Sequence, residues 1–401
     1  MSHGPRIIDA ETMSVPTSGI WPRLHIIGIV MLIIGAGASF AMKGDGEQFA
    51  YSWLVSFLYF MSIGLGALFF VLVQFATKSG WGIVVRRIAE NAAASLILLS
   101  VAFIPVYLSL TKLYHWTNAE HVAHDPVLQS KAPYLNASRF LIFGIAYFVI
   151  WSFLAWKFRS GSVRQDSSGD TSITRSLVRW AGPGIMLFAI TTTFASFDWA
   201  MSLTPHWYST IFGVYFFSGS LVAVFSFVSL VVIGLQRAGK LDGVVTAEHL
   251  QDLGKLLFAF IVFWAYIGFS QFFLIWYANI PEETEWYLAR AEGSWADLTL
   301  ALAIGHFVVP FFLLMSRHVK RNRLGLGLFS VLMLVMHFVD LHWVVMPTLH
   351  HEGFTPTLLD FTTLLAIGGL FLTAFGLGLS RSKLVPVKDP RLIESITFEN
   401  F

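Results

Sequence analysis

The sequence has 401 residues, of which 56% are hydrophobic and only 12% are charged, with a mean hydropathy of +0.67 and a net charge of +2. A soluble domain cannot bury this much apolar surface, so the composition predicts an integral membrane protein with several spans. The sequence contains no cysteine, which excludes disulfides, thiolate-held iron–sulfur clusters and covalently attached c-type haem from this chain.

The first 20 residues carry Asp9, Glu11 and Pro16 and no apolar core, which predicts a polar tail without a cleavable signal peptide. Ten apolar runs follow, each long enough to cross a bilayer. Because lipid cannot satisfy exposed backbone groups, and no run alternates as membrane-barrel strands do, we expect an all-α membrane protein with ten transmembrane helices. The runs cover residues 21–42, 49–76, 84–111, 138–158, 179–203, 208–235, 253–280, 295–316, 324–347 and 358–380.

Lysine and arginine are divided unequally between the two sides of this arrangement. The terminal tails and the loops on their side hold 21 of the 26 basic residues. Positive loops stay in the cytoplasm, so both termini are predicted to be cytoplasmic. On the other side, loops 114–136 and 281–293 are rich in Trp, Tyr, His and Glu, which suits either a docking surface or ordinary solvated loops. The linker 160–174 is polar and rich in Ser and Gly, which predicts a mobile segment.

The chain contains a weak internal repeat. Asp198 and Asp340 each lie seven residues before a proline near the end of an apolar run, and the second and sixth runs begin with the same Tyr-Ser pair. The pattern predicts two tandem four-helix bundles, helices 2–5 and 6–9, flanked by helices 1 and 10. The expected segments are a cytoplasmic tail (1–20), the first helix (21–48), the first bundle (49–207), the second bundle (208–350), the tenth helix (351–380) and a cytoplasmic tail (381–401).

Four polar residues near the outer ends of the runs are the leading candidates for proton transfer or for binding a quinone headgroup: Asp198, Asp340, His337 and His342. A carboxylate inside a membrane helix costs about 2.5–3.5 kcal/mol, so it is a functional candidate. If the helix continues to Pro205, Asp198 lies roughly 10 Å below the turn. The matching places of Asp198 and Asp340 suggest a pair across the bundle interface. Polar contacts that hold helices together are the alternative interpretation.

Further polar residues suggest a proton path toward the cytoplasmic side. His306 and His337 lie at comparable depth, which fits a proton relay, the axial ligands of a b-type haem, or structural histidines. Arg86 and Glu90 are four residues apart and can pair on one helical face, either as an interfacial ion pair or as the mouth of the path. The complete set of path candidates is Glu90, Arg87, Lys255, Thr192, Tyr266, Ser270, Gln271 and His306.

Three stretches carry a resemblance to a known family: SFDWAMSLTPHWYSTIFGVYFF (196–217), LGKLLFAFIVFWAYIGFSQFFLIWYANIPEET (253–284) and VPVKDPRLIESITFEN (385–400). They resemble the ActF-type membrane subunit of bacterial alternative complex III, a quinol oxidoreductase that reduces cytochrome c or another periplasmic acceptor. The membrane subunits of that complex resemble the NrfD, or polysulfide reductase membrane subunit, superfamily, whose members have two four-helix bundles.

The resemblance implies a subunit of the bacterial inner membrane with no cofactor of its own, in contact with lipid and with quinol or quinone. The implied protein partners are an NrfD-like sister membrane subunit and periplasmic subunits that hold iron–sulfur clusters and c-type haems. Nothing in the resemblance implies binding to nucleic acid. Two other functions stay open: a stand-alone proton-coupled secondary transporter, which the parallel direction of the repeat disfavours, and a structural membrane anchor without a site of its own.

Overall fold

The structure is a computed structural model that describes residues 13–400, so Arg6, Asp9 and Glu11 lie outside the described residues. Within that range the chain forms helices and no strand, and ten helical segments are long and apolar enough to cross a membrane. This confirms the predicted fold class, because each apolar run falls on one segment. The ten segments are Trp21–Ala41, Glu47–Ala76, Ile83–Leu108, Ala137–Ser168, Thr171–Leu203, Phe212–Arg237, Ala247–Ala278, Gly293–Leu314, Arg323–Thr348 and Leu358–Ser380.

Most segments consist of one long α-helix, and some are interrupted by short turns of other helix types. The long helices are α1 (Leu24–Ala41), α2 (Glu47–Ala76), α3 (Ile83–Leu99), α8 (Ala137–Ser168), α9 (Thr171–Trp199), α10 (Phe212–Arg237), α11 (Ala247–Ala278), α13 (Gly293–Leu302), α16 (Arg323–Val345) and α17 (Leu358–Ser380). The short ones are α4 (Phe103–Leu108), α5 (Leu110–Leu113), α6 (Ala119–His124), α7 (Pro126–Lys131), α12 (Pro281–Leu288), α14 (Val309–Leu314), α15 (Arg317–Arg321) and α18 (Leu392–Ile396).

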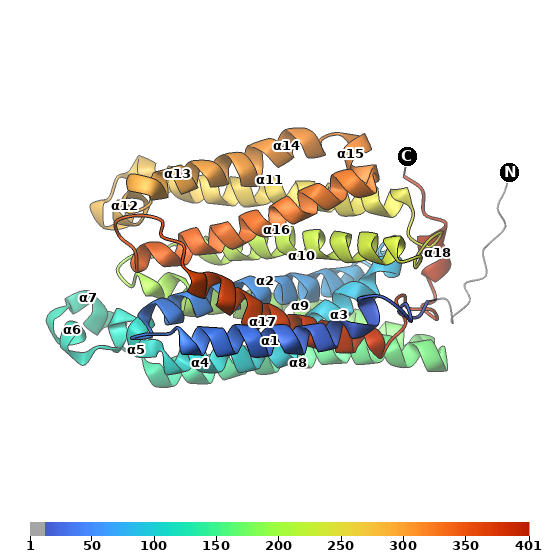
Figure 1. Cartoon of the computed structure of the whole chain (residues 1–401), viewed down its shortest axis with the longest axis horizontal. Helices are drawn as coiled ribbons and strands as arrows, with labels where there is room; N and C mark the ends of the chain where they lie inside the picture. Colours follow the sequence, from blue (N-terminus) through green and yellow to red (C-terminus); the bar gives the residue numbers. More distant parts are fainter. Residues whose placement is uncertain (1–12, 401) are drawn as a thin grey trace.

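The long helices form two groups that lie side by side (Figure 1). In the first group α2, α3, α8 and α9 each pack on the next in a closed ring, and in the second α10, α11, α13–α14 and α16 do the same. Helices α2 and α10 pack against each other between the groups, and α1 packs along α17, which covers α2 and α3. The groups contain predicted helices 2–5 and 6–9, while the internal repeat that would relate one group to the other stays a prediction.

Small residues permit the closest helix approaches at the centre of the molecule. Gly66 of α2 lies so close to α10 that a Cβ there would come within 2.3 Å of the Ser220 carbonyl oxygen. Apolar side chains gain little from packing against each other when the alternative is lipid, so close backbone contact at small residues supplies much of the association. Any larger residue at position 66 would therefore push the two groups apart.

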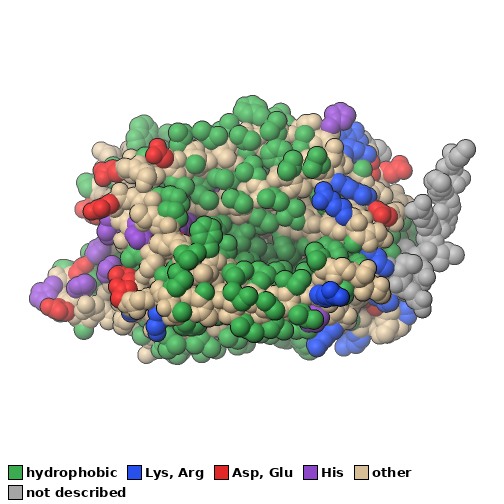
Figure 2. Space-filling model, in the orientation of Figure 1, with side chains coloured by type: hydrophobic (Ala, Val, Ile, Leu, Met, Phe, Trp, Pro, Cys, Tyr) green, Lys and Arg blue, Asp and Glu red, His purple; other side chains and the backbone are tan. Residues whose placement is uncertain are grey.

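The surface is arranged as a membrane protein requires. Hydrophobic side chains cover the middle of the face in Figure 2, Lys and Arg gather at the end that carries both termini, and Asp, Glu and His gather at the other end. Large apolar side chains of α11 such as Phe269 and Tyr277 are exposed. The distribution fits a multi-pass membrane protein, and the side on which the termini lie stays a prediction.

The prediction of a mobile linker over residues 160–174 was wrong. Helix α8 continues to Ser168, and only Gly169 and Asp170 separate it from α9. Gly169 has a φ of +68°, which glycine adopts without strain, and this conformation ends α8. The polar residues of this stretch fix the helix to its neighbour, because Arg87 of α3 donates hydrogen bonds to Ser162 at 3.0 Å and to Asp166 at 2.7 Å.

Candidate functional site

The second group of helices encloses a buried carboxylate, Asp340 of α16, which is only 2% exposed. The hydroxyl of Tyr215 on α10 donates a hydrogen bond to one carboxylate oxygen, and the indole N–H of Trp264 on α11 donates to the other at 3.2 Å. Three helices therefore meet at this one side chain. Among residues 13–400 no Lys, Arg or His forms an ion pair with it, so the carboxylate is held by neutral donors alone.

His337 lies one helical turn from Asp340 and connects α16 to α2. Its Nε2 is 2.7 Å from the hydroxyl oxygen of Ser62, and its Nδ1 is buried without a hydrogen-bond partner in the described part of the chain. Gly219 of α10 permits this arrangement, since a Cβ there would lie 2.9 Å from the imidazole. A cavity of about 10 Å³ lies between these residues, close to the volume that one water needs. A polar route thus leads from the second group toward the first.

His306 lies in a π-helical turn, η5 (Ala303–Val308), between α13 and α14. Pro310 has no N–H to donate to the carbonyl one turn earlier, so the backbone adopts the wider π register there. The imidazole is completely buried, stacks on Trp264 with 3.9 Å between ring centres, and has no hydrogen-bond partner on either nitrogen among the described residues. The His306 ring therefore packs on the face of the same indole whose N–H donates to Asp340.

A large apolar cavity of about 990 Å³ borders this cluster, between α11 and the helices that follow it. Tyr215 and Trp264, the two residues that bind Asp340, form part of its wall. The polar residues that line it include Gln271, whose Nε2 donates to the Tyr287 hydroxyl at 2.9 Å. Ligand pockets commonly have this size and combine apolar walls with a few converging polar groups.

Arg290 contributes a buried positive charge to the same cavity. The side chain is 3% exposed, and its N–H groups donate to the carbonyl oxygens of Trp286 at 2.7 Å, Trp343 at 3.1 Å and Val344 at 2.8 Å. The guanidinium also lies 3.4 Å from the centre of the Trp286 ring. Burial lowers the pKa of Arg290 to about 9, which leaves it protonated at neutral pH. In the described part of the chain no carboxylate pairs with this cation, so it can attract an anion.

Asp198 occupies a different environment in the first group. Its carboxylate accepts a hydrogen bond from Tyr147 at 2.7 Å and forms an ion pair with Arg139 at 3.1 Å, both from α8. Helix α9 ends at Trp199, so the rise calculated for an α-helix up to Pro205 overestimated the depth of this carboxylate. The suggested pair between Asp198 and Asp340 is not formed, because each carboxylate binds side chains of its own helix group.

His342 lies away from Asp340, on another face of α16. Its ring contacts those of Trp295 and Phe354, and its Nε2 is buried without a hydrogen-bond partner in the described residues. This placement follows from the two-residue spacing, which turns the two side chains to different sides of the helix.

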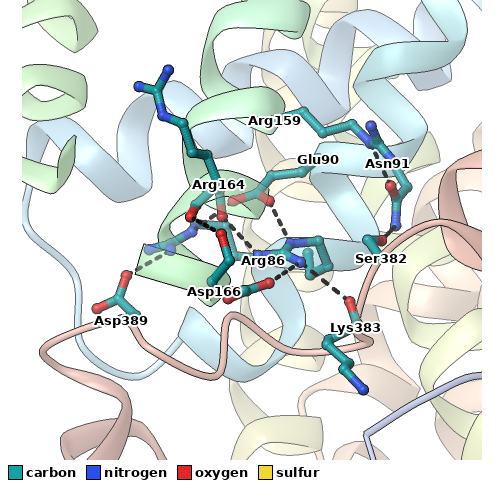
Figure 3. A network of polar contacts seen from close by, with 12 residues as sticks. Arg86, Glu90, Asn91, Arg159, Arg164, Asp166, Ser382, Lys383 and Asp389 are labelled. Carbon is teal, nitrogen blue, oxygen red and sulfur yellow. Dashed lines mark hydrogen bonds and ion pairs between the residues drawn. The ribbon is translucent and has the colours of Figure 1, made fainter. Parts of the chain in front are cut away.

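The path candidates near the basic end divide into buried and exposed groups. Glu90 accepts hydrogen bonds from Arg86 at 3.0 Å and Arg87 at 2.8 Å, which confirms the predicted pairing four residues apart. Figure 3 shows how Arg86 also reaches Asp389 of the C-terminal tail, at 2.7 Å. Lys255 is exposed and binds Asp252 and Asn400, so it does not join this network.

The remaining candidates are not connected to Asp340 by hydrogen bonds. Thr192 has a buried hydroxyl without a partner among residues 13–400. Tyr266 is 64% exposed and lies at the rim of the large cavity, and Ser270 is partly exposed on the same helix. The structure thus places Asp340 and His337 at the small cavity and Gln271 in the wall of the large one. It stacks His306 on Trp264, which also lines the large cavity, and leaves Thr192 apart from them.

Sequence reasoning missed several residues that complete these sites. It counted Arg139 and Arg290 as ordinary loop cations, although both are directed inward. It did not single out Trp264, Tyr147 or Tyr287, because aromatic residues are abundant in this chain and have no distinctive spacing. The only available signal was an isolated arginine three residues after an aromatic pair, as in the stretch from Trp286 to Arg290. Comparison with known proteins gives no assignment, because no family model matches the chain and no curated protein shows significant similarity.

Proposed function

We propose that this chain is an integral membrane subunit of a respiratory complex that oxidises quinol and reduces cytochrome c or another periplasmic acceptor. The observation that carries the proposal is the apolar cavity of about 990 Å³ whose wall residues Tyr215 and Trp264 bind the buried Asp340. The sequence resemblance to the ActF-type subunits supports the same function and the bacterial inner membrane as its location, with both termini in the cytoplasm.

The cavity suits a quinone in its chemistry. Its walls are mainly apolar and aromatic, which favours an isoprenoid tail and a flat ring. Gln271 and Tyr287 supply hydrogen-bonding groups for the ring oxygens, and Arg290 supplies a positive charge that stabilises a deprotonated quinol. A ring bound here would lie beside Tyr215, whose hydroxyl is bonded to Asp340.

Oxidation of a quinol to a quinone releases two electrons and two protons. We assign the electrons to iron–sulfur clusters or c-type haems in partner subunits, because this chain has no cysteine to hold such centres. Asp340 is placed to accept a proton through Tyr215, and His337 lies on the same helical face to pass it toward Ser62 of α2.

The test is to purify the tagged chain in a gentle detergent and measure its content of haem and iron and its quinol-dependent reduction of a c-type cytochrome. We expect haem, iron and activity to accompany the chain. Recovery of a chain that carries neither and transports a solute with protons would support the transporter alternative. If an active complex is recovered but no substitution in the cavity changes its quinol kinetics, the alternative of a structural anchor would be supported instead.

The cavity itself is tested by a matched pair of substitutions on neighbouring residues. Ala303→Trp places an indole in the cavity, whereas Ala301→Trp places it on the exposed side of α13, outside the cavity lining. We expect the first to raise the KM for quinol about tenfold, roughly 1.4 kcal/mol of lost binding, and the second to leave it unchanged. Equal effects of both would contradict a quinone site in this cavity.

A further inference from the structure

We propose that a second cavity, at the basic end of the molecule, binds the phosphate headgroup of an anionic phospholipid. The cavity has a volume of about 680 Å³ and lies between the end of α2, the start of α3, the first half of α9 and the C-terminal tail. Basic side chains dominate the charged residues of its lining: Lys78, Arg86, Arg175, Arg179 and Arg391, against the single carboxylate of Asp389.

The charges of the lining are not all neutralised within the protein. Arg86 is paired with Glu90 and Asp389, and Arg391 is paired with Glu394. By contrast, Lys78, Arg175 and Arg179 form no ion pair among residues 13–400. Three basic side chains therefore line one cavity without a close ion pair in the described residues, although Arg175 interacts with the carboxylate of Asp170 from a longer distance. A phosphate diester would give them a direct partner.

Neutral donors are also present around the cavity. Gln74 is only 4% exposed, and its side-chain amide forms no hydrogen bond within the described part of the chain. The lining also contains Ser79, Ser172 and Thr174, of which Ser172 and Thr174 already donate their hydroxyl hydrogens to Asp170 at 2.6 Å and to Gln165 at 2.9 Å. The buried atom without a partner is Oε1, an acceptor, which a hydroxyl donor of a headgroup would satisfy, while Nε2 can donate to a phosphate oxygen.

The residues around the cavity favour a lipid over a soluble anion as its ligand. Trp180 follows Arg179 directly and is partly exposed, and the ammonium group of Lys157 lies 4.3 Å from its ring centre. Tryptophan and lysine at such positions mark the level of the lipid headgroups. Phe75 and Val178 add apolar surface to the cavity, which suits the glycerol and upper acyl region of a phospholipid. Basic pockets between helices on the cytoplasmic side commonly bind anionic headgroups.

The test uses the full chain in detergent, with native mass spectrometry to count bound lipid. The probes are phosphatidylglycerol, zwitterionic phosphatidylcholine and inorganic phosphate. The test variant is Arg175→Gln with Arg179→Gln. The control is Arg237→Gln with Arg381→Gln, which removes the same charge from exposed positions outside the cavity. We expect the test variant to lose phosphatidylglycerol affinity at least about tenfold and the control to keep it.

Each other outcome would overturn the proposal. Equal losses in both variants would show that general surface charge, not this cavity, attracts the lipid. Equal binding of phosphatidylcholine would show that the headgroup charge is not recognised. Displacement of phosphatidylglycerol by millimolar inorganic phosphate, with the same loss in the test variant, would identify a soluble anion as the ligand instead.

Discussion

Asp198 and Asp340 have the same seven-residue spacing to a following proline, yet the fold gives them opposite environments. Asp198 is held by Arg139 at 3.1 Å and by Tyr147, both from α8. Asp340 is held by Tyr215 and Trp264, which are neutral donors from α10 and α11. The charge of Asp198 is balanced by a cation within the protein, whereas Asp340 has only neutral donors around it.

The difference shows that the partner helices, and not the repeated motif, decide what each carboxylate can do. Arg139 lies in the first turn of α8, where the chain enters the membrane, and it brings a charge to the edge of the first group. The side chain that reaches Asp340 from α11 is the indole of Trp264, which donates a hydrogen bond to the carboxylate but does not neutralise its charge. We therefore expect Asp198 to stabilise the fold and Asp340 to take part in chemistry.

The largest effect is expected from breaking the Arg139–Asp198 pair. Because Asp198 is 2% exposed and the Arg139 side chain 15%, removing either partner leaves a poorly solvated charge. Arg139→Leu or Asp198→Leu should each lower the free energy of unfolding by about 2–3 kcal/mol, and the double variant should lose less than the sum. Denaturant unfolding of the purified chain, monitored by tryptophan fluorescence, measures the free energy of unfolding of the two single variants and the double variant.

The exposed pair of Lys255 and Asp252 is the control for that cycle. The Lys255 side chain is 48% exposed, so Lys255→Gln should change stability by less than about 1 kcal/mol. Strictly additive losses in the Arg139 and Asp198 variants would mean that the ion pair contributes no coupling, and the structural role of Asp198 would then lack support.

A smaller effect in free energy, but one specific to function, is expected at Asp340. Asp340→Asn keeps the shape and the acceptor oxygen but cannot exchange a proton, so quinol oxidation by the assembled complex should fall at least about tenfold, or ~1.4 kcal/mol in the barrier. Asp198→Asn should affect stability more than turnover. Quinol turnover that is normal in Asp340→Asn and lost in an assembled Asp198→Asn complex would reverse the roles given to these residues.

The sequence alone predicted the helices well, because ten long apolar runs leave lipid-spanning helices as the only economical structure. It also singled out Asp340, His337 and Gln271 as candidates, since polar residues are conspicuous among apolar ones, and their roles stay a prediction. It did not predict Arg139 or Trp264 as partners, because which helices become neighbours is not encoded in any single run. The mobile linker was predicted wrongly for a related reason: polar residues such as Ser162 looked solvated in sequence but bind a buried arginine of another helix.

The smallest effect is expected at an exposed carboxylate that binds the turn following Asp198. Asp125 pairs with His206 at 2.6 Å, and both side chains reach solvent. Partial desolvation acts to raise the pKa of Asp125, but the N–H of Leu128, the His206 side chain and the N–H of Val127 together outweigh it and lower that pKa. A carboxyl group whose pKa is lower in the folded state stabilises the fold above its unfolded pKa of about 4, and this contribution disappears as the pH falls through the folded value.

Asp125→Asn should therefore lower the Tm slightly at pH 6, by less than either substitution in the Arg139–Asp198 pair, because asparagine also caps helix α7. The difference in Tm between wild type and variant should shrink below about pH 4, where the wild-type carboxyl group also becomes protonated. Thermal unfolding of both proteins at pH 6 and at pH 3 measures this difference in Tm. A Tm loss at pH 6 as large as that of Arg139→Leu would mean that burial does not decide how much each carboxylate stabilises the fold. The contrast between Asp198 and Asp340 would then need a cause other than the helices that surround them.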